Sequence, residues 1–93
     1  MNMQELITSE CDAIKDLLLK KNKSYGNSAA EPVKIFSKIK TIEQINVRID
    51  DKLSRISRGN EFDNEDTEQD LIGYLILKRA VKTFHNSNQG EMI

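Results

Sequence analysis

The sequence predicts an all-α fold, a small helical bundle of two to three long helices plus a short one, in a single domain that spans residues 1–93. Three stretches repeat apolar residues three and four positions apart, which is the spacing of one helix face, and no stretch alternates as a strand does. Only 5% of the residues are aromatic. Because a chain of 93 residues is near the lower limit for a self-sufficient core, we expect a homo-oligomer, a dimer or larger, to complete that core.

The first helix is predicted from Met3 to about Lys21. Its apolar face is formed by residues spaced four, three and four positions apart, namely Ile7, Cys11, Ile14 and Leu18. We expect Cys11 to be a small, buried hydrophobic residue of this face. It is the single cysteine, so no internal disulfide is possible.

A turn is predicted over residues 23–31, where Gly26, Asn27 and Ser28 break the helical pattern. Pro32 suits the first turn of a short helix that would end at Ile39.

The middle helix is predicted over residues 41–58. Thr41 and Gln44 have the spacing of a capping box, in which Thr41 is the N-cap and the side chain of Gln44 reaches back to it. Gly59 follows the last apolar position and is the expected C-cap.

The last helix is predicted to begin after an acidic loop, with Asp63 or Asn64 as its N-cap. Its apolar run at residues 71–77 covers nearly every side of the helix and should be buried. Gly73 lies inside this run and costs helix stability, which a close approach of another helix would explain. The polar tail at residues 85–93 is expected to fray.

Charge is distributed unevenly along the chain. Between Ile14 and Arg58 there are eleven Lys or Arg and five acids, whereas from Gly59 to Leu77 there are six acids and no base. The two segments either serve one function or pair with each other between neighbouring helices. The net charge of -1 argues against bulk nucleic-acid binding.

The N-terminus is acidic and has no apolar core segment, so we expect no signal peptide. No apolar run approaches the length of a membrane span. The expected location is therefore the cytoplasm, without membrane contact.

The first candidate site is the predicted turn. Tyr25 could present a ring for stacking, Asn27 and Ser28 could offer polar groups to a phosphate or a base, and Lys23 adds positive charge. The alternative is a plain turn whose Tyr25 packs on the core.

The second candidate site is a charged face of the middle helix. Arg48, Asp51, Lys52 and Arg55 lie three and four positions apart, so they share one face. Asp51 could orient an arginine, which would leave Lys52 and the other arginine to contact an anion. The alternative is a solvated face whose ion pairs contribute little.

The third candidate site is the start of the last helix. Asp66 and Asp70 are four positions apart, and Tyr74 is one turn further. Two carboxylates at this spacing could share a Mg²⁺ ion that bridges phosphate oxygens. The alternatives are that Asp66 serves the helix N-terminus and that Asp70 pairs with Lys52 or Arg55 across two antiparallel helices.

These motifs follow one another as Lys…Tyr-Gly-Asn-Ser, Arg-Ile-Asp-Asp-Lys-Leu-x-Arg and Glu-Asp-Thr-x-x-Asp-Leu-x-x-Tyr. In this order they resemble the first type of nucleotide modification associated domain, a MazG-like family of phage and bacterial proteins, over roughly residues 21–77. The resemblance implies a helical protein that handles nucleotides. The residues assigned to ligand binding are Lys23, Tyr25, Asn27, Ser28, Arg48, Lys52, Arg55 and Tyr74.

The sequence departs from the MazG pattern at one place. MazG-type proteins carry Glu-Glu-x-x-Glu on one helix, where this chain has Asp-Asp-Lys-Leu-Ser-Arg and so supplies cations in place of the last acid. Fewer carboxylates provide fewer metal ligands, which puts hydrolysis in doubt and leaves anion binding intact.

Three functions are consistent with these features. The favoured one is a nucleotide or nucleotide-signal binding protein of phage type, which could sequester a host nucleotide messenger in the host cytoplasm as a counter-defence. The first alternative is a Mg²⁺-dependent nucleoside triphosphate pyrophosphohydrolase, with Asp51, Asp66 and Asp70 as metal ligands. The second alternative is an inhibitor of a host defence enzyme that acts through the acidic residues 61–70.

Overall fold

Three α-helices form the described part of the chain in a computed structural model, which contains no strand there. The structure describes residues 1–26, 29–32, 38–59 and 66–91, the last four by their backbone alone. The helices are α1 (Met3–Tyr25), α2 (Thr41–Arg58) and α3 (Thr67–Glu91). The predicted all-α class is confirmed.

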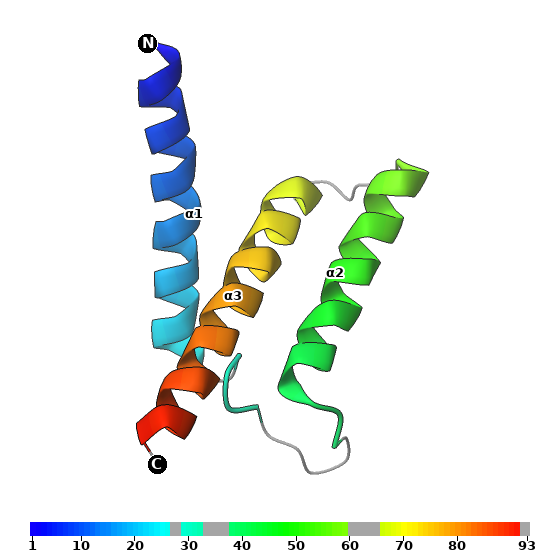
Figure 1. The fold of residues 1–93 in the computed structure, drawn as a ribbon. Coiled ribbons are helices and arrows are strands. Elements are labelled where there is room, and N and C mark those ends of the chain that lie inside the picture. The colour runs from blue at the N-terminus through cyan, green and yellow to red at the C-terminus, as the bar shows by residue number, and fades with distance from the viewer. Residues whose placement is uncertain (27–28, 33–37, 60–65, 92–93) are drawn as a thin grey trace.

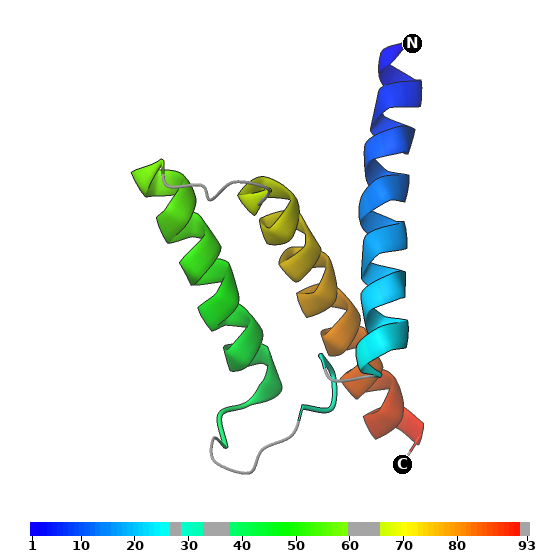
Figure 2. The ribbon, with the colours of Figure 1, turned by 180° about the vertical axis from the view of Figure 1, so that it is seen from behind.

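α3 is the central helix, because α1 and α2 lie on either side of it in both views of the ribbon (Figures 1 and 2). α2 runs antiparallel to α3, whereas α1 runs in the same direction as α3 (Figure 1). Within the described residues, α3 contacts both other helices, and α1 and α2 do not contact each other. The charged face of α2 and the end of α1 are therefore held on different flanks of the same helix.

α1 is one turn longer than predicted and ends at Tyr25. Asn2 caps its start, because the Asn2 Oδ1 accepts a hydrogen bond of 2.8 Å from the backbone N–H of Glu5. Gly26 follows with a φ of 63°, a conformation that favours glycine. The prediction that Cys11 is buried is wrong, since its side chain is exposed. The reason is that the N-terminal half of α1 extends beyond α3 (Figure 1), so Cys11 lies only at the edge of the space between the two helices.

α2 begins at the predicted residue but without the predicted capping box. Thr41 is the first helical residue and is buried, Lys40 is the N-cap without a side-chain hydrogen bond, and the Gln44 Nε2 donates to the Ile39 carbonyl at 3.0 Å. Gly59 ends the helix as predicted, with a φ of 69° and its N–H directed to the carbonyls of Arg55 and Ile56. Most of the short helix predicted before Ile39 lies outside the described residues.

α3 is capped by Asp66, whose Oδ1 accepts a 2.9 Å hydrogen bond from the backbone N–H of Gln69. The prediction of Asp63 or Asn64 as the N-cap is wrong, and the alternative in which Asp66 serves the helix N-terminus is confirmed. Asp63 and Asn64 themselves lie outside the described residues. The helix continues to Glu91, through most of the segment for which a frayed tail is predicted. None of the helices in the described ranges has a stretch with the length and apolarity that crossing a bilayer requires.

The apolar core joins α2 to α3. Ile45 and Ile49 of α2 and Val81 of α3 are buried together, and the partly buried residues around them are Ala29, Ala30, Ile42, Leu71 and Tyr74. On the α1 side, Ile14 is buried. Across all described residues, only these four large apolar side chains are buried, so the core that these residues form is small.

Leu18 of α1 approaches Gly73 of α3, in agreement with the predicted helix approach. A methyl group at this position would lie 3.4 Å from the Leu18 Cδ2, which is an ordinary van der Waals distance to the end of a flexible side chain. We therefore expect Gly73→Ala to raise the free energy of unfolding by about 0.5–1 kcal/mol through its higher helix propensity. Chemical denaturation measures this gain.

The matched control is Ala80→Gly, which makes the reverse change at an exposed position of the same helix. It should lower stability by a similar amount. A loss of stability in Gly73→Ala would show that the approach of α1 leaves no room for a methyl group.

Candidate functional site

A shielded ion pair joins α2 to α3. The Lys52 Nζ lies 3.4 Å from the Asp70 Oδ2, and the two side chains are only 12% and 27% exposed. This contact confirms the alternative in which Asp70 pairs with Lys52 across two antiparallel helices. Lysine is rarely shielded to this degree without a charged partner, and the Asp70 carboxylate is that partner for the Lys52 ammonium between the helices.

A second ion pair lies on α2 beside the first. The Arg55 Nε is 3.2 Å from the Asp51 Oδ2, one helical turn apart, so Asp51 orients an arginine as predicted. Arg48 is exposed one turn before Lys52. Three cationic side chains thus follow one face of α2, and the middle one is the most shielded.

Along α3, the aromatic residue nearest in sequence to Asp70 is Tyr74. It is half-buried, packs against the core residues, and follows Asp70 by one turn. We call the set Arg48, Asp51, Lys52, Arg55, Asp70 and Tyr74 the basic cluster. It contains the whole second predicted site, the charged face of α2, and two residues of the third predicted site, Asp70 and Tyr74.

The three carboxylates predicted to bind Mg²⁺ already have partners within the chain. Asp51 pairs with Arg55, Asp70 pairs with Lys52, and Asp66 accepts the capping hydrogen bond at the start of α3. In the described ranges, no three His, Cys, Asp or Glu side chains come together in a way that could hold a metal ion.

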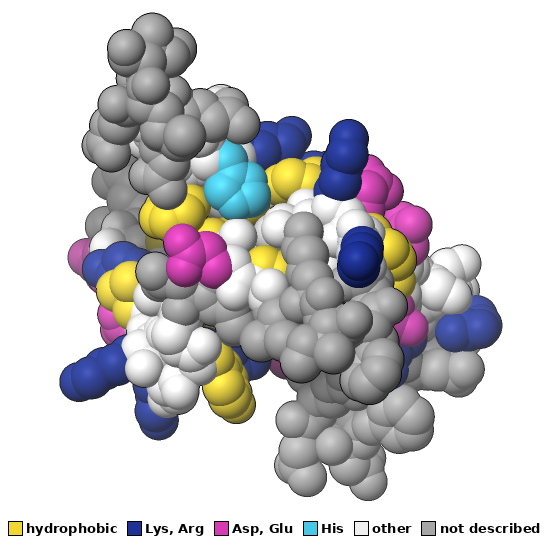
Figure 3. Space-filling view, turned by 90° about the horizontal axis from the view of Figure 1, so that it is seen from below, with side chains coloured by type: hydrophobic (Ala, Val, Ile, Leu, Met, Phe, Trp, Pro, Cys, Tyr) yellow, Lys and Arg dark blue, Asp and Glu magenta, His cyan; other side chains and the backbone are white. Residues whose placement is uncertain are grey.

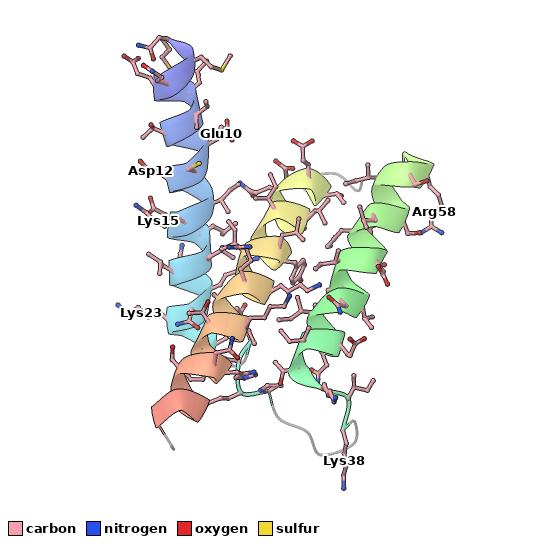
Figure 4. All side chains as sticks on the ribbon, in the orientation of Figure 1. Glu10, Asp12, Lys15, Lys23, Lys38 and Arg58 are labelled. Atoms are coloured by element: carbon pink, nitrogen blue, oxygen red, sulfur yellow. The ribbon has the colours of Figure 1, made fainter. Side chains whose placement is uncertain are left out.

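The predicted turn site is on the other flank of α3. Tyr25 ends α1 and is 71% exposed, so it does not pack on the core, and α1 has no contact with the helix α2 that carries most of the basic cluster. Lys23 points away from α2 (Figure 4). The two other predicted residues of this site, Asn27 and Ser28, lie outside the described residues. The reason for the separation is that α3 stands between α1 and α2 (Figure 1).

One polar contact has no counterpart in the sequence-based predictions. The His85 Nε2 lies 3.1 Å from the carbonyl oxygen of Ala30, which holds residues 29–32 against the C-terminal part of α3. Figure 3 looks onto this end and shows the His85 ring among apolar side chains. A single histidine within a polar tail carries no pattern that predicts such a contact.

An apolar groove was also not predicted. It has a volume of about 550 Å³ and runs between α1 and α3. Its apolar lining includes Ile14 and Leu18 from α1, and Ile72, Ile76 and Phe84 from α3. The periodicity of each helix indicates its own apolar face, but it does not show that these two faces leave a groove between them.

Comparison of the chain with protein-family models, with curated proteins and with solved structures finds no match. The resemblance to the nucleotide modification associated domain therefore stays a prediction.

Proposed function

We propose that the chain binds a nucleotide, or another small molecule that carries a phosphate, through the basic cluster. The observation that supports this proposal best is the shielded Lys52–Asp70 pair. A shielded ion pair adds little net stability compared with apolar side chains of similar volume. Two leucines at these positions would stabilise the contact between α2 and α3 as well as the ion pair does. The presence of two charges therefore supports a role in binding a ligand.

The chemistry of the cluster suits a phosphate group. The Lys52 ammonium has three N–H donors, so it can keep its contact with Asp70 and also donate to a phosphate oxygen. Arg48 and Arg55 lie within one turn on either side, and a guanidinium can donate two parallel hydrogen bonds to a phosphate. Tyr74 offers a ring and a hydroxyl group for the rest of the ligand.

Binding without turnover is favoured over hydrolysis because the carboxylates of Asp51, Asp66 and Asp70 are engaged by Arg55, by the α3 N-terminus and by Lys52. In a phage-encoded protein, such binding would sequester a nucleotide messenger in the host cytoplasm. The acidic residues at 61–65, on which an inhibitor of a host enzyme would depend, lie outside the described residues.

The test is a calorimetric and thermal-shift screen without metal, using AMP, ADP, ATP, cyclic AMP, cyclic dinucleotides and inorganic phosphate. We expect at least one nucleotide to raise the melting temperature and to bind. Arg48→Gln combined with Arg55→Gln should weaken that binding at least tenfold, which corresponds to about 1.4 kcal/mol.

The control for this double variant is Lys20→Gln combined with Arg79→Gln. It removes the same charge from exposed positions of α1 and α3, outside the basic cluster, and should leave the affinity unchanged. Equal weakening by both double variants would indicate a general charge effect, and the absence of binding to every nucleotide would refute the proposal. Release of pyrophosphate from ATP after addition of Mg²⁺ would instead identify the hydrolase.

A further inference from the structure

We propose that two copies of this chain form a dimer through α1 and α3, in which the projecting half of α1 from each copy lies in the apolar groove of the other. The proposal concerns the flank of α3 opposite α2, so it does not depend on nucleotide binding by the basic cluster.

The first observation is the total surface of the chain. Its accessible surface is 7622 Å². A compact monomer of 10.7 kDa exposes about 5,500 Å². The radius of gyration is 15.4 Å, whereas a compact domain of this length has about 12 Å. The chain thus exposes about 2,000 Å² more than its mass requires, which exceeds the roughly 800 Å² that each partner buries in a standard interface.

The second observation is the location of apolar side chains on α1. Ile7, Cys11, Ile14 and Leu18 follow one face of the helix. The lower half of this face packs on α3, where Ile14 is buried and Leu18 contacts Gly73. The upper half projects past the start of α3 (Figure 1), so Ile7 is 56% exposed, and Cys11, which lines the edge of the groove, is exposed as well. One continuous apolar face is therefore covered along only half of its length.

The third observation is the groove itself. Ile72 and Ile76 of α3 form part of its lining and remain exposed beside α1. A volume of about 550 Å³ accommodates several side chains of a helix. The same chain therefore carries an uncovered apolar helix face and an apolar groove.

These two features identify the occupant as a second copy. If the projecting half of one α1 enters the groove of the partner, a two-fold axis places the partner's α1 in the first groove as well. Such a contact is self-complementary and closed, so it ends at the dimer. Each copy thereby covers the exposed residues Met3, Ile7, Cys11, Ile72 and Ile76.

The native mass of the full chain is the first test. Sedimentation equilibrium in the micromolar range should give twice 10.7 kDa, and the melting temperature should rise with protein concentration. A mass of one chain throughout that range would overturn the proposal. The groove would then be left for another occupant, an apolar small molecule or a different protein.

The second test compares two single variants, each with one exposed apolar side chain replaced by Glu, one on α1 and the other on α2. Ile7→Glu should convert the dimer to a monomer, because it places a charge on the projecting face of α1. Val47→Glu is the matched control, since Val47 is 61% exposed on α2, outside this interface, and should leave the mass at that of the dimer. Dimers in both variants, or monomers in both, would show that the proposed face is wrong.

A loss of helix content in Ile7→Glu that does not occur in Val47→Glu would also support the proposal. Ile7 is largely exposed within one chain, and Glu has a higher helix propensity than Ile, so neither intrachain packing nor local preference explains such a loss.

Cys11 gives an independent readout because it is the single thiol and lies on the projecting face. The thiol should react slowly with an aromatic disulfide reagent in the native protein and at least tenfold faster in Ile7→Glu. Fast reaction in a native protein that has the mass of a dimer would show that the two copies meet through another surface.

Discussion

Replacement of Asp70 by Asn should lower the free energy of unfolding by about 2 kcal/mol, because it leaves the shielded Lys52 ammonium without this carboxylate. Breaking a fully buried pair costs about 3–5 kcal/mol, and the remaining exposure of both side chains reduces that figure. Urea unfolding followed by circular dichroism measures the loss.

The matched control is Asp12→Asn. The Asp12 Oδ1 and the Lys15 Nζ are also 3.4 Å apart, but their side chains are 55% and 61% exposed on α1 (Figure 4). An exposed pair of this kind contributes less than about 0.5 kcal/mol. Equal losses in Asp12→Asn and Asp70→Asn would mean that shielding between α2 and α3 does not strengthen the pair.

A double replacement separates the structural role of the pair from its proposed role in binding. Lys52→Met with Asp70→Leu exchanges two charges for apolar side chains, so it should restore most of the stability that Asp70→Asn loses. The same protein should no longer respond to a nucleotide, because the central cation of the cluster is gone. A stable double variant that still binds would exclude Lys52 from the ligand site.

Ile45→Ala should lower the free energy of unfolding by about 3 kcal/mol, the cost of removing three carbon atoms from a well-packed site and leaving a cavity. Ile45 is buried against Ile49 and Val81, at the centre of the contact between α2 and α3. Because the described core contains few other buried side chains, this loss should be a large part of the total stability. Thermal unfolding measures it.

Val47→Ala is the control for this core substitution. It shortens an exposed side chain two positions away on α2 and should change stability by less than about 0.5 kcal/mol. Comparable effects at positions 45 and 47 would show that α2 packs with a different face towards α3.

The helices themselves could be predicted because their signals are local. The three- and four-residue spacing indicates all three helices, and Gly59 ends α2 where a left-handed residue is needed. The start of α3 was predicted less well, since several acidic residues in a row can each act as a cap. The structure selects Asp66, whose role at the helix N-terminus the sequence offers only as an alternative.

The candidate site could be predicted in part. The spacing on α2 identifies the face that carries Lys52 and Arg55, and it allows the pairing with Asp70 that the structure contains. The positions of Tyr25 and Cys11 could not be predicted, because they depend on which helix lies between the others and on how far α1 extends beyond α3. Periodicity along one helix contains no information about either feature.

The central position of α3 also implies an order of folding. α2 and α3 are joined by a short connection, so their contact closes a small loop, whereas α1 reaches α3 only across the whole of α2 and both connections. Loop closure costs more entropy as the loop grows, and local contacts form faster. The hairpin of α2 and α3 should therefore form first, and α1 should dock onto it afterwards.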